Sequence, residues 1–223
     1  MRGFTLIEVL VTLVILTFGL LGIAGLMAKG QRIAFEAYQR QQAVALAADM
    51  AERIRGNRFL AVTCPTLLPG CTTYIAAAPL TTPLGQGLFY SDYRTGTITD
   101  CAVLTCNQMQ LALYDIALWD GLLNGYSEQQ TGGAVRFGGI VNARGCVEQI
   151  ANTSATCPAP GSGSVAVFSA TLRVSVAWQG NDDTIAPVVP GGGTPSCGNG
   201  QYGVETKRRI VTYDILLQEP CPP

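Results

Sequence analysis

The chain of 223 residues contains no histidine, and only 13% of its residues are charged, with a net charge of −1. The missing histidine excludes histidine-based acid–base catalysis and Ser-His-Asp triads. The low net charge gives no basic footprint for nucleic acid. Asp92, Asp182 and Asp183 lie among Gly, Asn and Ser residues, a context typical of turns rather than of a calcium site. We therefore predict no enzyme activity, no cofactor and no metal site.

Charge is also missing from one long segment near the N-terminus. No charged residue occurs from Val9 to Ala28, and about 20 apolar residues are enough to span a bilayer as a helix. Glu8 stands at the head of this segment. A carboxylate in such a place costs about 2.5–3.5 kcal/mol on insertion scales. No basic residue lies between Arg2 and Lys29, so the partner of Glu8 must come from elsewhere.

A cut between Gly3 and Phe4 would supply that partner. Phe4 would then carry a new α-amino group, which is protonated near neutrality because its reference pKa is about 7.7–8. Within one helix this amine lies a turn away from Glu8 and points outward. We therefore expect it to reach Glu8 of a neighbouring, axially staggered copy.

These residues carry a family resemblance. Gly3, Phe4, Thr5, Leu6, Ile7 and Glu8, followed by Val9-Leu10 and the apolar run, resemble the N-terminus of the type IV pilin superfamily. The resemblance implies that prepilin peptidase removes residues 1–3 as a leader, that Phe4 is N-methylated, that residues 4–28 form the transmembrane and assembly helix, and that Glu8 acts in assembly.

Two simpler interpretations account for less of this segment. A secretory signal peptide cut near Gly22-Ile23-Ala24 would have a shorter apolar core and leaves Glu8 unexplained. A plain membrane anchor explains the length, but neither Gly3 nor Glu8. The glycines Gly19, Gly22 and Gly25 share one helix face and suit either close packing of membrane helices or a weak point in the helix.

Cysteine is absent from the first 63 residues and occurs eight times after them. Arg2 favours a cytoplasmic N-terminus, which places everything after Lys29 outside the membrane. Without histidine or a C-x-x-C pair, we predict disulfides formed in an oxidising compartment rather than a zinc site. Eight cysteines allow 105 connectivities. The simplest pairs nearest neighbours: Cys64–Cys71, Cys101–Cys106, Cys146–Cys157 and Cys197–Cys221.

The residues after the apolar run predict an α+β domain. Residues 29–58 continue the helix as an amphipathic half, with apolar residues at three- or four-residue steps and an acid-first pair at Asp49 and Arg53. Residues 59–223 form the globular domain, with an antiparallel sheet packed on the helix and loops stapled by disulfides. Its expected elements are a long loop over Phe59–Thr99, a helix over Asn107–Asn124, a hairpin of Val135–Asn142 with Cys146–Ile150, and strands over Val165–Gln179 and Ile210–Leu217.

We interpret two clusters of polar and aromatic residues in this domain as structural. Tyr114, Asp115 and Trp119 suit core packing of a short helix better than a ligand platform. The basic run Lys207-Arg208-Arg209 precedes a strand, and we expect it to form the solvated edge of that strand.

Within the superfamily the chain most resembles minor pilins of the PilV type, the type IV pilus modification proteins. Residues 8–11, 48–57 and 174–178 carry this resemblance. It implies a low-copy subunit that primes or caps pilus assembly near the tip. Its expected partners are prepilin peptidase, the inner membrane, other minor pilins, the major pilin and a tip adhesin, without nucleic acid. The expected location is the inner membrane, with a periplasmic globular domain, and then the pilus on the cell surface.

Two alternatives from other classes remain open. A minor pseudopilin of a type II secretion system shares the N-terminus, although such relatives tend to have smaller soluble domains. A pilin-like receptor would bind DNA or a surface ligand, and the missing basic patch argues against DNA.

Overall fold

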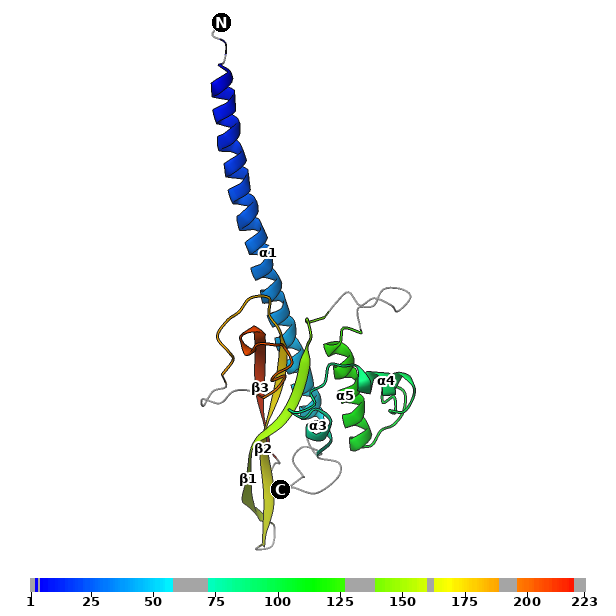
Figure 1. Ribbon diagram of the computed structural model, residues 1–223. Coiled ribbons are helices and arrows are strands. Elements are labelled where there is room, and N and C mark those ends of the chain that lie inside the picture. Colours follow the sequence, from blue (N-terminus) through cyan, green and yellow to red (C-terminus); the bar gives the residue numbers. More distant parts are fainter. Residues whose placement is uncertain are drawn as a thin grey trace. The chain divides into compact units, whose positions relative to one another are not determined.

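The computed structural model describes residue 3 and residues 5–57, 72–126, 139–159, 163–188 and 196–218 (Figure 1). Two compact units divide the chain, with residues 1–38 in the first and 39–223 in the second. The first unit consists of the N-terminal part of helix α1 (Leu6–Gly56). The last part of this helix belongs to the second unit.

A three-stranded antiparallel sheet forms the frame of the second unit, with strand order β1-β2-β3. Strand β1 covers Arg144–Ala159, β2 covers Gly163–Gln179 and β3 covers Arg208–Gln218. Among the described residues between α1 and the sheet lie the helices α3 (Thr72–Ala77), α4 (Leu88–Arg94) and α5 (Gln108–Leu123). The 3-10 turn η1 (Glu205–Lys207) leads into β3. The predicted α+β class, with a long N-terminal helix packed on an antiparallel sheet, is confirmed.

The core lies between one face of the sheet and the helices. Alternate residues of β2 enter it, as the period of two in the sequence predicts. From α1, the side chains that enter the core recur at helical spacing, and several of them are alanines. The fully buried members of this core include Ala43, Ala47, Met50, Ile54, Ile116, Trp119, Val147, Val174, Val176 and Ile215.

Helix α5 agrees with the sequence prediction almost to the residue. Asn107 forms the N-cap, and its side chain accepts a hydrogen bond from the amide of Gln110 while the Gln110 side chain accepts one from the amide of Asn107. This reciprocal capping box satisfies two amides that the first helical turn leaves without partners. Trp119 is fully buried, so the core interpretation of the Tyr-Asp-Trp pattern is confirmed for this residue.

Two predictions about secondary structure are wrong. Of the predicted strand Val135–Asn142, residues 139–142 form a turn and irregular chain instead, and residues 135–138 lie outside the described residues. Cys146–Ile150 belongs to the long strand β1, which pairs with β2. The expected loop over Phe59–Thr99 contains α3 and α4. These helices are short, and a single turn or two carries too weak a periodicity to be recognised in a sequence.

The disulfide Cys101–Cys106 is present as predicted, but Cys146 is bonded to Cys197 with a Cα–Cα distance of 5.9 Å. The predicted pairs Cys146–Cys157 and Cys197–Cys221 are therefore wrong. Cys157 lies 11 residues further along the same strand as Cys146, which corresponds to about 36 Å, whereas a disulfide needs a Cα–Cα distance below about 7 Å. Cys64, Cys71 and Cys221 lie outside the described residues.

Arg208 also departs from the prediction of a solvated edge, since the residue is only 1% exposed. Its Nε donates a hydrogen bond to the Glu205 carboxylate (2.6 Å), and its Nη1 donates one to the Cys197 carbonyl (3.0 Å). The guanidinium therefore joins the start of β3 to the disulfide on the sheet face opposite the core. A charge pattern in sequence does not reveal such a buried pair.

Candidate functional site: the N-terminal segment of helix α1

The N-terminal segment begins its helix at a defined place. The Thr5 carbonyl accepts hydrogen bonds from the amides of Glu8 (3.1 Å) and Val9 (3.3 Å), so Thr5 occupies the N-cap position and Glu8 the third helical position. A Thr-x-x-Glu pattern at these positions is the signature of a capping box. The negative charge of Glu8 also suits the positive end of the helix dipole.

The Glu8 side chain is exposed, and no other described residue gives it a hydrogen bond or an ion pair. Its apolar neighbours are exposed as well: Leu6 is 84% exposed, Ile7 70% and Val9 51%. A helix surface this apolar is stable only when lipid or other protein covers it. Glu8 would then sit in an apolar environment without a counter-charge from the described part of its own chain.

The helix is long and apolar enough to cross a membrane, and the most apolar window of this near-N-terminal segment has none of its residues buried inside the chain. The two threonines of the segment are already satisfied. Thr12 Oγ1 donates to the Val9 carbonyl (2.9 Å) and Thr17 Oγ1 to the Val14 carbonyl (2.8 Å). These bonds lower the cost of placing a hydroxyl group in lipid. Glu8 therefore remains the one costly side chain of the apolar part of the segment.

The three glycines of the segment do not interrupt α1. A Cβ atom added at Gly19, Gly22 or Gly25 would meet no atom of the chain within 4 Å. The space beside them is therefore open, as close packing against another membrane helix requires.

A polar network fixes the other end of α1 to the globular domain. Arg53 donates one hydrogen bond to Asp49 (2.8 Å) and one to Asp115 of α5 (3.1 Å). The Tyr74 hydroxyl donates to the other Asp115 oxygen (2.8 Å). Burial raises the pKa of the Asp115 carboxyl, against the hydrogen bonds from Tyr74 and Arg53 that lower it. Burial, and then the Asp115 charge, raises the pKa of the Tyr74 hydroxyl.

Two further side chains, Asn57 and Trp119, bind α1 to its neighbours through three hydrogen bonds. The Asn57 side chain donates to the Tyr74 hydroxyl (3.2 Å) and to the Gln108 carbonyl (2.8 Å). The indole Nε1 of Trp119 donates to the Leu46 carbonyl (3.0 Å). The buried polar groups thus bond across elements that are far apart in sequence, and they fix the position of the helix end in the domain.

Asp120 of α5 has a comparable structural role. Its carboxylate accepts hydrogen bonds from the amides of Gly85 (2.7 Å), Gly87 (3.1 Å) and Tyr90 (3.3 Å). Gly85 has a φ of 109°, and an added Cβ would lie 2.1 Å from the Ala143 carbonyl oxygen. The carboxylate therefore holds the start of α4 against α5.

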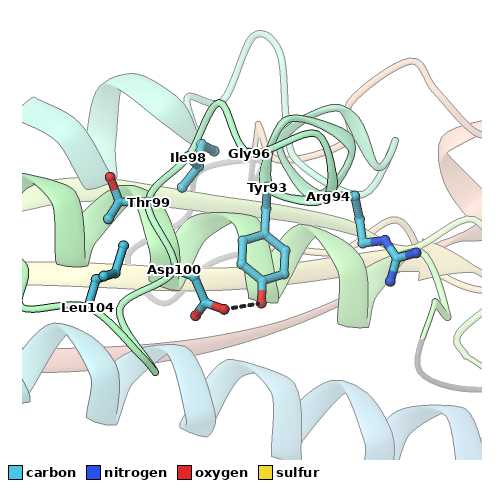
Figure 2. Close-up of a pocket in the computed structure, with 7 residues that line it drawn as sticks. All are labelled: Tyr93, Arg94, Gly96, Ile98, Thr99, Asp100 and Leu104. Carbon is cyan, nitrogen blue, oxygen red and sulfur yellow. Dashed lines mark hydrogen bonds between the residues drawn. The ribbon is translucent and has the colours of Figure 1, made fainter.

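A surface pocket of about 460 Å³ lies where Asp100 and Leu104 flank Cys101, which is bonded to Cys106. Figure 2 shows the residues that line it. The Tyr93 hydroxyl donates a hydrogen bond to one oxygen of Asp100 (3.3 Å), and the other oxygen accepts one from the Ala102 amide (3.0 Å). Burial and the Asp100 charge raise the pKa of Tyr93. These polar groups bond one another and shape the loop, so the pocket offers few free groups that would define a ligand.

Asp182 and Asp183 lie outside the helices and strands, whereas Asp92 lies in α4, so the expectation that Asp92 is a turn residue is wrong. Asp183 accepts a hydrogen bond from the Thr206 hydroxyl (2.9 Å), the Asp182 carbonyl accepts one from Arg209 (2.6 Å), and the Asp92 carbonyl accepts one from the Thr95 hydroxyl (3.1 Å). Within the described part of the chain, no three His, Cys, Asp or Glu side chains converge as metal ligands would.

Comparison with known proteins agrees with the N-terminal geometry. Residues 1–24 match the model of the prokaryotic N-terminal methylation motif. Searches of curated proteins and of solved structures gave no match to this chain. The motif supports a type IV pilin-like protein that is a substrate of prepilin peptidase and is anchored in a membrane before assembly. The α+β architecture agrees with this class.

Proposed function

We propose that the chain is a minor pilin of the type IV pilus. Prepilin peptidase cleaves it between Gly3 and Phe4, the new amino group of Phe4 is methylated, and α1 holds the subunit in the inner membrane until it enters the filament. The observation that carries this proposal is the carboxylate of Glu8, which has no described partner and stands at the head of the exposed apolar segment of α1. The motif match over residues 1–24 supports it independently.

The electrostatics of Glu8 give assembly a direction. In the membrane the carboxylate costs a few kcal/mol, and the amine of the subunit's own Phe4 lies a turn away along the axis. A neighbouring subunit displaced along the axis brings its amine beside Glu8. The carboxylate of Glu8 and the neighbouring amine then neutralise each other within an apolar environment of lipid or side chains. Each subunit therefore favours addition to a staggered neighbour over remaining alone in the membrane.

The rest of the chain suits a periplasmic domain. The two disulfides Cys101–Cys106 and Cys146–Cys197 belong to an oxidising compartment. Arg2, on the other side of the apolar segment, favours a cytoplasmic N-terminus. The subunit thus crosses the inner membrane once before assembly and is exposed on the cell surface afterwards.

The proposed place near the tip rests on the resemblance to PilV-type minor pilins. Residues 48–57 carry much of that resemblance, and three of them have contacts that explain their presence. Arg53 links α1 to Asp115 of α5, Asp49 contacts Arg53 from within α1, and Asn57 links the helix to α3 and the start of α5. This segment therefore docks the helix on the domain. We propose other minor pilins and the major pilin as neighbours, with a tip adhesin as a further partner.

Substitution of Glu8 tests the proposal. Glu8→Leu leaves the amine of a neighbouring Phe4 unpaired in the filament, and loss of one member of a buried pair costs about 3–5 kcal/mol. Since 1.4 kcal/mol corresponds to a factor of ten, the ratio of subunit in sheared filaments to subunit in membranes should fall by about a hundredfold or more. Glu8→Gln should fail equally, because it also removes the charge.

Thr12→Leu is the matched control. It removes a polar group one turn further along the same helix face, and the Thr12 hydroxyl is already bonded to Val9 within the helix. Its ratio should equal that of the wild type. If Glu8→Leu also enters filaments at the wild-type ratio, Glu8 does not drive assembly and the proposal loses its main support.

A further inference from the structure

Exposed aliphatic side chains occur in the loops that follow β2 and precede β3. Ile185 is 90% exposed, Val188 64% and Val204 55%. Single exposed aliphatic residues are ordinary on a protein surface, but several of them in one place mark a contact with protein or membrane. The position of these loops in the domain decides between the two.

Hydrogen bonds fix the two loops beside each other. The Gly180 amide donates to the Lys207 carbonyl (2.8 Å), and the Thr184 amide donates to the Thr206 carbonyl (2.9 Å). The Thr206 hydroxyl in turn donates to the Asp183 carboxylate (2.9 Å). The exposed aliphatic residues follow or precede these tied positions by a few residues, so the fold presents them at one end of the sheet.

Contacts between α1 and α5 show which end of the domain this is. Arg53 bonds to Asp115, and the Leu46 carbonyl accepts a hydrogen bond from Trp119. The two helices therefore run antiparallel, and the C-terminal part of α5 lies on the side where α1 enters the second unit. A Cβ added at Gly145, the second residue of β1, would lie 2.5 Å from the Trp119 ring. The start of β1 thus lies on this side too.

The sheet register carries this direction to the loops. The start of β1 pairs with the end of β2, where Gln179 pairs with Arg208 at the start of β3. The guanidinium of Arg55, near the C-terminal end of α1, lies 5.8 Å from the ring centroid of Tyr213, which is further along β3. The loops between β2 and β3 therefore lie at the end of the domain that α1 enters.

Chain connectivity keeps this end near the membrane. The charge-free run ends at Ala28 and the second unit begins at Gln39, with α1 continuous between them. The connection therefore spans about 16 Å at 1.5 Å per residue. Lipid head groups occupy about 5–8 Å on each side of the hydrocarbon core, and membrane helices are commonly tilted. Before assembly, the bilayer surface is therefore the apolar partner held closest to these loops.

The charges beside the loops also suit a lipid surface. Asp182 and Asp183 follow β2, and Lys207 and Arg209 lie around the start of β3. Arg209 donates a hydrogen bond to the Asp182 carbonyl (2.6 Å), so groups of both signs are close together. Phosphate head groups attract the basic side chains, and water among the head groups solvates the acidic ones. An apolar protein surface would instead desolvate these charges.

We propose that Ile185, Val188 and Val204 rest in the surface of the bilayer that anchors α1, and so orient the domain on the membrane before assembly. The inference rests on one part of the proposed function, the membrane anchoring of α1. It does not depend on the place of the subunit in the filament. Entry into the filament then removes these side chains from lipid.

A fluorescent amino acid at position 185 tests this inference in the full chain, reconstituted in vesicles of phosphatidylethanolamine and phosphatidylglycerol. A nitroxide-labelled lipid in the vesicles should quench this label. The matched control is a label at Val103, which is 77% exposed and precedes α5 at the opposite end of the domain, where Asn57 bonds to the Gln108 carbonyl. The control label should not be quenched.

The outcomes separate this inference from the proposed function. A chain that does not float with the vesicles would contradict the anchoring of α1 and remove the basis of the inference with it. A chain that floats without lipid quenching at position 185, or with equal quenching at 185 and 103, would overturn the inference alone. A blue-shifted label at 185 that the nitroxide lipid does not quench would show that protein covers the loop, which also overturns it.

Substitution of Ile185 provides a second measurement. With the label at position 204, Ile185→Asp should lower the lipid quenching to the level found at position 103, because a carboxylate at the centre of the contact is costly in lipid. Val103→Asp introduces the same charge at the opposite end and should leave the quenching at position 204 unchanged. Equal quenching in both variants would contradict the inference.

Discussion

Substitution of Asp115 examines how the end of α1 is held. Asp115→Ala removes the acceptor of the Tyr74 hydroxyl and one of the two carboxylates that Arg53 contacts. Tyr74 is 1% exposed, so its hydroxyl loses its acceptor in a buried place, at a cost of about 1–3 kcal/mol. The ion pair is partly open, with side-chain exposures of 26% for Arg53 and 8% for Asp115. It adds about 1 kcal/mol.

The expected total is therefore about 2–4 kcal/mol. Asp115→Asn keeps an oxygen for Tyr74 and loses the charge, so it should cost only about 1–2 kcal/mol. Urea unfolding of the full chain in detergent, with its disulfides intact, measures both values. Asp182→Ala is the control, because the Asp182 side chain is exposed. A loss below 1 kcal/mol for Asp115→Ala, or equal losses for both Asp115 variants, would refute this account of the network.

Two further predictions concern the disulfides and pH. In the chain-entropy relation, the stability lost with a disulfide grows with the length of the loop it closes, so removing Cys146–Cys197 costs about 4 kcal/mol and removing Cys101–Cys106 about 2 kcal/mol. Urea unfolding of the two double-serine variants should give losses in this order, and the reverse order would contradict the prediction. The hydrogen bond from Arg173 lowers the pKa of the Asp214 carboxyl. The ion pair stabilises the fold by less than about 1 kcal/mol, because Asp214 is 44% exposed. This stabilisation is present above the unfolded pKa of about 3.9 and is lost as pH falls through the folded pKa. The stability difference between wild type and Asp214→Asn should therefore shrink from pH 6 to pH 2.5, and a constant difference would contradict the pairing.

Local patterns predicted the elements whose contacts follow from their own periodicity. The spacing of Ala43, Met50 and Ile54 predicted the buried face of α1, and these residues are fully buried. Asn107 follows a disulfide loop and precedes an amphipathic run, which is the pattern of a helix start. The alternation in β2 predicted which residues enter the core.

The features that sequence did not predict depend on contacts between distant segments. The second half of β1 consists of small, uncharged residues and has no alternation of apolar and polar side chains, so neither its length nor its pairing with β2 was visible. The bond between Cys146 and Cys197 joins residues 51 positions apart in the sequence, and no local pattern indicates it. The burial of Arg208 depends on Glu205 and on the Cys197 carbonyl, and a run of three basic residues gives no sign of it.

The sequence predicted which residues of the N-terminal site act in cleavage and assembly, but not what surrounds them in the fold. Gly3, Glu8 and the apolar run define the cleavage and assembly hypothesis from sequence, and the structure adds that Glu8 has no described partner and that α1 continues unbroken through Gly19, Gly22 and Gly25. Phe4 lies outside the described residues. Its role remains a prediction from the motif.

The mass of the N-terminal peptide, taken from the chain in sheared filaments, tests the central claim most directly. The account predicts a peptide that begins at Phe4 and carries one additional methyl group. It also predicts that the Gly3→Val variant stays in the membrane with residues 1–3 attached, because a peptidase pocket that fits glycine excludes a larger side chain. A filament-derived chain that still begins at Met1, or a Gly3→Val variant that is processed normally, would contradict it.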